Sequence, residues 1–398
     1  AVSDCTVSAT GTTTGSPYVT AMGWLALHGM TNNIANTSST RSSVTATTKA
    51  SNAVAMGWLV QTGTTIVNNA ATTMTHGNVS ATATAYACSM GWATRGALTT
   101  TNATTTVANG SVVASGTATA LTDVAVVTMG WIAFDGSLST TNAFTTATVS
   151  VVKATGGGAC TAAMGWAIAK PPASTVVTSL TATNAITTAT LSTISATGTA
   201  DTVAAMGWAA YTGAMTVTDA TATLACGTVT AMGWVAYEGA LSATNAITTA
   251  TLSTISATGT ADTVAAMGWA AYTGAMTVTD ATTTLACGTV TASGTSNVAA
   301  MGWLTYSGLL TAKNTQSTAV NSVVTATGSG YSVAAMGWLG WNSMVATNNT
   351  AAVSDCTVSA TGTTTGSPYV TAMGWLALHG MTNNIANTSS TRSSVTAT

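Results

Sequence analysis

The apolar residues of this chain recur in a short segment built around Met-Gly-Trp, and the stretches between these segments alternate Thr with small apolar residues. In Thr263–Tyr272, regular alternation would place Ala265, Met267 and Trp269 on one face of a strand and Gly268 on the other. Thr and Val favour an extended, pleated backbone, and Gly occurs too often for long helices. The pattern therefore predicts an all-β protein.

The Met-Gly-Trp segments form an internal repeat. Eleven of the twelve tryptophans lie in this tripeptide, with spacings between 26 and 42 residues and a modal value near 35. They are Trp24, Trp58, Trp92, Trp131, Trp166, Trp208, Trp234, Trp269, Trp303, Trp338 and Trp375. A fixed period of this length is typical of repeat architectures in which each unit packs on its neighbours.

We expect a repetitive β-solenoid of about eleven such units, each with about three strand segments, one of them running from Ile247 to Thr258. A parallel solenoid stacks equivalent residues of successive units, whereas an antiparallel meander with three strands per unit would reverse direction at every repeat. The 26-residue spacing between Trp208 and Trp234 supports this choice. Ala225–Trp234 is eight residues shorter than Ala286–Trp303, and the loss of an even number of residues preserves the alternation of faces. Stacked antiparallel sheets of a cross-β kind remain the alternative.

Two duplicated segments are longer than one repeat unit. Residues 1–47 recur unchanged as 352–398, and residues 183–231 recur as 244–292 with one change, from Ala222 to Thr283. We interpret 1–398 as one continuous repeat array.

The repeated tripeptide is the predicted packing and assembly site, since Met fills irregular gaps, Trp supplies a large buried area, and Gly admits a closely approaching backbone. The representative residues are Met22, Gly23, Trp24, Met56, Gly57, Trp58, Met232, Gly233, Trp234, Met267, Gly268, Trp269, Met301, Gly302 and Trp303.

Much of the scarce charge lies four residues past Trp, just before a recurrent Gly. His28, Asp135, Lys170 and Glu238 occupy this variable position, which predicts solvent-exposed turn tips without a catalytic role. About eleven residues past Trp the chain usually carries Asn or Asp, which suits a second turn or an internal amide ladder.

Charge and composition narrow the possible functions. Lys and Arg number 7 and Asp and Glu number 9, whereas Thr and Ser number 92 and 37. The chain lacks the clustered basic residues that nucleic-acid binding requires. It also lacks an apolar run long enough for a transmembrane helix. We find no catalytic constellation, cofactor motif or metal-ligand spacing, and we expect a protein that is not an enzyme.

The six cysteines show no Cys-x-x-Cys spacing. Small buried residues within strands are the first interpretation, and disulfides of an oxidising compartment are the second.

The sequence favours an extracellular or cell-surface structural protein that self-assembles into a fibre, sheath or surface layer, with copies of itself as the partner. The alternative is a stalk of an adhesin or phage fibre that binds a receptor or glycan, and an ice-binding β-solenoid comes after it. Asn-x-Ser/Thr sequons occur at about the frequency that chance predicts in so Thr-rich a chain, so glycans are possible partners without specific support.

Overall fold

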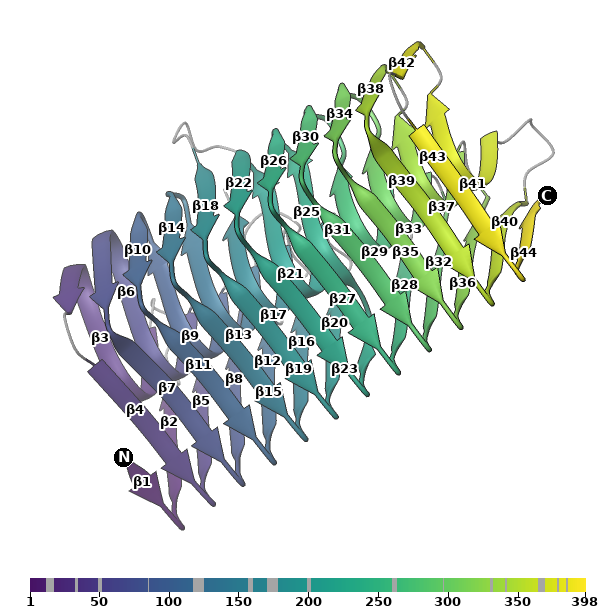
Figure 1. The fold of residues 1–398 in the computed structure, drawn as a ribbon. Helices are drawn as coiled ribbons and strands as arrows, with labels where there is room; N and C mark the ends of the chain where they lie inside the picture. The colour runs from purple at the N-terminus through teal and green to yellow at the C-terminus, as the bar shows by residue number, and fades with distance from the viewer. Residues whose placement is uncertain are drawn as a thin grey trace. The chain divides into compact units, whose positions relative to one another are not determined.

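A computed structural model shows an all-β chain without helices among the residues that it describes, which are 1–11, 18–32, 35–48, 52–84, 86–116, 125–156, 160–169, 178–198, 202–259, 263–295, 297–329, 332–340, 342–363, 369–377, 379–383 and 386–398. The chain divides into two compact units, Ala1–Gly213 and Ala214–Thr398. Each unit is a parallel β-solenoid, which confirms the expected fold and excludes the antiparallel alternative (Figure 1).

Unit 1 contains three parallel sheets. Sheet A contains β1 (Val2–Ser3), β4 (Ala35–Thr40), β7 (Ala70–Thr75), β11 (Thr104–Ala108), β15 (Phe144–Thr148) and β19 (Ile186–Thr190). Sheet B contains β2 (Thr6–Gly11), β5 (Ser43–Thr48), β8 (Asn78–Ala83), β12 (Ser111–Gly116), β16 (Val151–Gly156) and β20 (Thr193–Gly198). Sheet C contains the Trp strands β3 (Tyr18–Asn32), β6 (Asn52–Asn68), β9 (Tyr86–Arg95), β13 (Ala125–Phe134), β17 (Cys160–Ala169) and β21 (Thr202–Thr212), with the short strands β10 (Leu98–Thr101), β14 (Leu138–Thr141) and β18 (Ser179–Thr183).

Unit 2 repeats this arrangement. Its part of sheet A contains β23 (Thr221–Ala225), β27 (Ile247–Thr251), β31 (Thr282–Ala286), β35 (Gln316–Val320), β39 (Asn349–Ser354) and β43 (Ala386–Thr391). Its part of sheet B contains β24 (Thr228–Val229), β28 (Thr254–Gly259), β32 (Thr289–Gly294), β36 (Val323–Gly328), β40 (Thr357–Gly362) and β44 (Ser394–Ala397). Its part of sheet C contains the Trp strands β25 (Met232–Glu238), β29 (Thr263–Ala271), β33 (Asn297–Thr305), β37 (Ser332–Gly340) and β41 (Tyr369–Ala377), with the short strands β22 (Ala214–Thr218), β26 (Leu241–Thr244), β30 (Met276–Thr279), β34 (Leu310–Lys313), β38 (Met344–Thr347) and β42 (Met381–Asn383).

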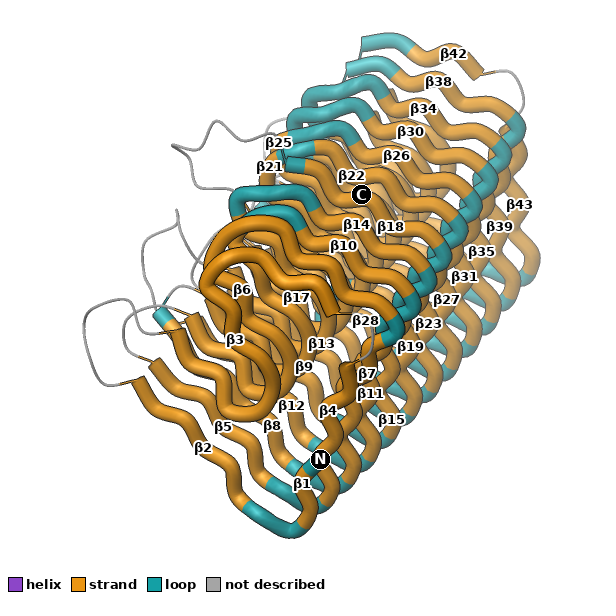
Figure 2. Tube along the Cα trace, turned by 90° about the vertical axis from the view of Figure 1, so that its left-hand side faces the viewer, coloured by secondary structure: helices purple, strands orange, loops and turns teal. Residues whose placement is uncertain are grey.

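A typical coil therefore carries four strands rather than three, separated by the corners seen in Figure 2. The stretch expected as one strand, Ile247–Thr258, is broken at Leu252, whose φ of +51° ends β27 and redirects the chain into β28. We call this corner between sheets A and B the A/B turn. Ser253 stabilises it, because its hydroxyl donates to the Thr251 carbonyl at 2.7 Å and accepts from Gly227 N–H at 3.3 Å.

Successive coils stack with identical residues in register. In β13 and β17, Met129 pairs with Met164, and Trp131 pairs with Trp166. The short coil that precedes Trp234 keeps this register, since Met232 pairs with Met267 and the lost residues come from the end of the sheet B strand and the start of the Trp strand. A solenoid thus absorbs the eight-residue deletion at one corner.

The core lies between the three sheets. Strands of sheets A and B alternate buried and more exposed residues, as in β31 and β8, so each presents one row of side chains inward. The Trp strands are buried along most of their length; in β37 every described side chain from Val333 to Gly340 is buried.

The Trp strand does not alternate regularly, which corrects the faces expected from the sequence. Val54 and Leu59 are five positions apart, a spacing that puts side chains on opposite faces of a regular strand, yet both belong to one hydrophobic cluster. Ala299 and Leu304 repeat this contact in unit 2. Gly57, with φ of +135°, lies between Val54 and Leu59 and changes the direction of the strand.

Candidate assembly surfaces

The Met-Gly-Trp residues form a continuous ladder through each unit. Neighbouring indole rings are stacked with centroids 4.6–5.0 Å apart and interplanar angles of 1–5°, from Trp24 to Trp208 in unit 1 and from Trp234 to Trp375 in unit 2. Parallel rings at this centroid separation are offset from one another, which is an arrangement that aromatic pairs prefer, and the coil register sets their spacing.

The burial of the expected packing residues depends on whether their coil has a neighbour on both sides. The Met and Trp side chains at 56, 58, 232, 234, 267, 269, 301 and 303 are at most 1% exposed. In the first coil, Met22 is half-buried and Trp24 is 40% exposed, because only the following coil covers them. Trp375 in the last coil is likewise half-buried, whereas Trp341 lies outside the described residues.

The glycine of each tripeptide is required by backbone geometry. Gly268 has φ of +147°, a region that residues with a side chain rarely adopt. A Cβ built on Gly268 would overlap the carbonyl oxygen of Gly302 in the next coil. The same overlap occurs at Gly23, Gly57 and Gly233, so the tripeptide combines a bulky ladder with a site of close backbone contact.

One buried polar cluster interrupts the apolar core of unit 2. Trp338 Nε1–H donates to Thr315 Oγ1 at 3.0 Å, and the Thr315 hydroxyl donates to Asn349 Oδ1 at 2.8 Å. Asn349, fully buried, also accepts from Thr315 N–H and donates to the Ala312 carbonyl at 3.0 Å. Ala281 precedes Thr315 in this column, so a polar pair replaces an alanine position. The one sequence signal for it is the departure from Ala in consecutive repeats.

The expected turn tips are only partly described. His28 is exposed, and its Nδ1 lies 3.0 Å from Thr62 Oγ1 in the next coil. Asp135 is half-buried. Glu238 ends β25, but its side chain, like the whole of Lys170, lies outside the described part of the structure.

The Asn and Asp positions form both the second turn and an amide ladder. Asn102, Asn142 and their equivalents have φ near +50°, and each Asn Nδ2 donates to the side-chain oxygen of the preceding coil at 2.9–3.2 Å. The ladder is exposed rather than internal. In unit 2, Asn245 donates to Asp219, and Asn314 donates to Asp280.

Within unit 2 the amide ladder has one mismatched step. Asp280 has no N–H to give to Asn245, and no side-chain hydrogen bond joins these two described residues. We expect Asp280→Asn to complete the ladder and raise the free energy of unfolding by ~0.5–1.5 kcal/mol, the usual net value of one hydrogen bond. Chemical denaturation measures this gain. Asn142→Asp is the reverse control, because it removes the donation from Asn142 to Asn102 and should lower stability by a similar amount. A loss of stability in Asp280→Asn would contradict the ladder's contribution.

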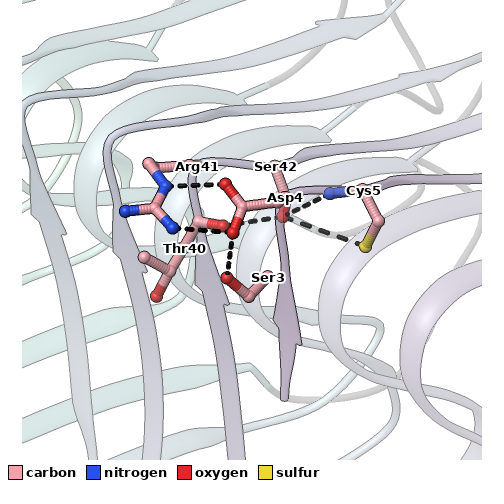
Figure 3. A network of polar contacts seen from close by, with 6 residues as sticks. All are labelled: Ser3, Asp4, Cys5, Thr40, Arg41 and Ser42. Atoms are coloured by element: carbon pink, nitrogen blue, oxygen red, sulfur yellow. Dashed lines mark hydrogen bonds and ion pairs between the residues drawn. The ribbon is translucent and has the colours of Figure 1, made fainter.

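The A/B turn carries the ion pair of the first coil (Figure 3). Arg41 Nε and Nη2 donate to the two carboxylate oxygens of Asp4 at 2.6 and 2.7 Å, and Ser3 Oγ donates to the same carboxylate. These hydrogen bonds, Arg41 first, lower the pKa of Asp4 well below its usual range. Arg392 and Asp355 repeat the pair in the duplicated segment. Any stability that the pairs supply is present above the ordinary Asp pKa and is lost as the pH falls.

No family model, curated protein or solved structure matches this chain. Within the described ranges, no three His, Cys, Asp or Glu side chains gather into a group that could hold a metal ion. No helix in that part of the chain has the length and hydropathy needed to cross a bilayer.

The cysteines divide into two classes, which corrects the expectation that they are small buried residues. Cys88 and Cys356 are buried, but Cys5, Cys226 and Cys287 are exposed, and all five are free thiols. The side chain of Cys160 lies outside the described part. Cys226 and Cys287 occupy the A/B turn, which sequence reasoning mistook for the interior of a strand.

The two classes should differ in reactivity. Burial raises the pKa of the Cys88 thiol to about 12, so its thiolate is scarce at pH 8. We expect iodoacetamide at pH 8 to alkylate Cys226 and Cys287 in the native protein and to spare Cys88 until the chain is denatured, as measured by mass spectrometry. Equal native labelling of Cys88 and Cys226 would show that the solenoid interior is open.

Proposed function

We propose that this chain is a non-enzymatic structural protein outside the cell or at its surface, and that it assembles by coil-on-coil stacking into a fibre, sheath or surface layer. One observation carries the proposal. The duplicated sequence stacks on its following coil in unit 1, where β3 pairs with β6, and on its preceding coil in unit 2, where the equivalent β41 pairs with β37. Both faces of this coil sequence can therefore accept another coil.

The terminal coils support continued stacking. In the first coil Trp24 and Leu25 are 40% and 46% exposed. In the last coil Tyr369, Met381 and Val395 are 40–50% exposed. Edge strands with free backbone groups and exposed apolar side chains favour strand addition. An end-to-end filament or a continuous tandem array would cover these surfaces.

The test compares a terminal and a lateral substitution. Trp24→Lys places a charge on the open end of the ladder and should abolish filaments in negative-stain microscopy and light scattering. Ile247→Lys is the matched control, because Ile247 is 42% exposed on the outer face of sheet A. Filaments of normal length in the Trp24 variant, or monomers of the unmodified protein, would overturn the proposal.

A second candidate, an ice-binding surface, is favoured by the outer face of sheet A. Thr146 and Thr148 in β15 pair with Thr188 and Thr190 in β19, which gives two columns of hydroxyl and methyl groups at the strand spacing. Such a column could order water or contact a glycan. Thermal hysteresis that is lost in Thr188→Lys would support this candidate over a purely mechanical role.

A further inference from the structure

Three consecutive A/B turns of unit 2 present a Cys, a Leu and a second Cys to solvent. Cys226, Leu252 and Cys287 have φ of +53°, +51° and +51°, and all three side chains are exposed, Leu252 by 60%. The backbone N–H of each residue donates to a carbonyl in the following coil, at Thr251, Ala286 and Val320 respectively. The three residues therefore lie in register in three successive coils, and we call them the Cys-Leu-Cys column.

The column departs from what the fold alone would select. Asn and Asp tolerate positive φ, and Asn109 and Asn321 occupy the same turn in other coils. Leu252 instead combines a disfavoured backbone conformation with an exposed apolar side chain, as Val149 and Leu191 do at the same turn in unit 1. Leu252 differs from them in unit 2 because an exposed cysteine lies at the same turn of the coil on each side of it. This combination of strain, apolar exposure and flanking thiols suggests a contact outside the chain.

We infer that this column is a lateral docking site for a second copy of the chain, arranged antiparallel about a two-fold axis through Leu252. Because Leu252 lies midway, the axis brings Cys226 opposite the partner's Cys287, Cys287 opposite the partner's Cys226, and the two Leu252 side chains together. The surface is therefore self-complementary, as a two-fold contact requires. The inference rests on the proposed structural function and adds the contact that joins neighbouring solenoids side by side.

Cys226 and Cys287 of one chain cannot form a disulfide with each other. Two strand spacings separate Cys226 from Cys287, roughly 10 Å. A disulfide needs Cα atoms about 4.4–6.8 Å apart. Each thiol is thus available to the other copy.

The covalent step needs an oxidant, which we take to be a small-molecule disulfide such as oxidised glutathione. The Cys226 thiolate attacks this disulfide, forms a mixed disulfide and releases one small thiolate. The partner's Cys287 thiolate then attacks the Cys226 sulfur, forms the S–S bond and releases the second thiolate. Each bond between copies therefore converts two protein thiols to a disulfide and reduces one small disulfide to two thiols.

The test uses the full chain with oxidised glutathione, followed by non-reducing denaturing electrophoresis. We expect a covalent dimer that reductant removes. Cys226→Ser or Cys287→Ser alone should each abolish it, and a mixture of the two variants should restore it, since one copy keeps Cys287 and the other keeps Cys226. Cys5→Ser is the control and should leave the dimer intact, because Cys5 is exposed elsewhere. Dimers in either single variant, or none in the mixture, would overturn the two-fold arrangement.

A second variant tests docking without changing the thiols. Leu252→Asn suits the positive φ but removes the apolar contact, and it should slow dimer formation by about tenfold, equivalent to ~1.4 kcal/mol, without lowering Tm. Val149→Asn is the matched control, because Val149 has φ of +49° and is 49% exposed outside the column. Equal dimerisation rates for both variants would contradict the role of Leu252.

Electron microscopy of the same samples in reductant separates this inference from the proposed function. If filaments form in reductant but oxidised glutathione gives no covalent dimer, the lateral contact is contradicted and the structural function stands. If oxidised glutathione gives the covalent dimer but no filaments form, the lateral contact stands and end-to-end assembly is contradicted.

Discussion

Gly268→Val is expected to destabilise unit 2 by roughly 2–6 kcal/mol, the sum of strain at a disfavoured φ and overpacking in a filled core. At φ of +147° the new Cβ would meet the carbonyl of Gly302, a backbone atom that cannot move without breaking the β29–β33 pairing. Thermal or urea unfolding measures the loss.

Gly340→Ala is the matched control for this substitution. Gly340 ends the Trp strand β37, has only ordinary contacts around a built Cβ, and pairs with Thr305 and Ala377 in the neighbouring coils. We expect it to keep or raise stability, by up to about 1 kcal/mol, because Gly in a strand carries an entropic cost. Similar losses for both variants would show that the Met-Gly-Trp glycine has no special role.

Asn349→Ala is expected to cost roughly 3 kcal/mol, because it leaves the Thr315 hydroxyl, the Thr315 N–H and the Ala312 carbonyl without their buried partner. The cost arises from stranded polar groups as much as from lost volume. Urea unfolding of the single variant gives the value.

The double variant Thr315→Ala, Asn349→Ala separates these causes. It restores the alanine column seen at Ala246 and Ala281, both fully buried, and should recover about 1–2 kcal/mol relative to Asn349→Ala. A double variant that is less stable than either single one would contradict the coupling. Asn349→Gln tests geometry alone, since the longer side chain keeps the amide but must displace its neighbours.

The parallel solenoid could be predicted because its causes lie in the repeat itself. Identical tripeptides at one period must stack when strands are parallel, and the structure pairs Trp131 with Trp166 accordingly. The amide ladder was also accessible, since Asn tolerates the positive φ that a turn requires, as at Asn142.

The A/B turn was hidden in the coils where an apolar residue occupies it. In three coils its positive-φ position carries Val149, Leu191 or Leu252, apolar residues that rarely adopt positive φ and therefore looked like the interior of a strand, although Asn109 and Asn321 occupy it elsewhere. The signal that could have found it is the next residue, which is often Ser or Gly, as at Ser253 and Gly288. The bend of the Trp strand was hidden for a related reason, because regular alternation assumes uniform φ and Gly57 departs from it.

The candidate assembly surfaces also differ in whether the sequence alone identifies them. The sequence identifies the Trp ladder and the duplicated terminal coils, which depend on repeated residues. It does not identify the exposed column around Leu252, because exposure there depends on a corner that only the fold creates. The exposed turn tip at His28 could be predicted from its variable position four residues past Trp24.

Cryo-microscopy of the assembled protein tests self-assembly by coil stacking most directly. We expect filaments with strands about 4.8 Å apart along the axis. The axial repeat should be roughly 48 Å, or ten coils, in a continuous tandem array with the 351-residue period, and roughly 53 Å, or eleven coils, in a stack of separate chains. Sequence 1–47 should lie between coils on both sides. Monodisperse single chains at high concentration, or filaments whose strands are not stacked along the axis, would contradict it.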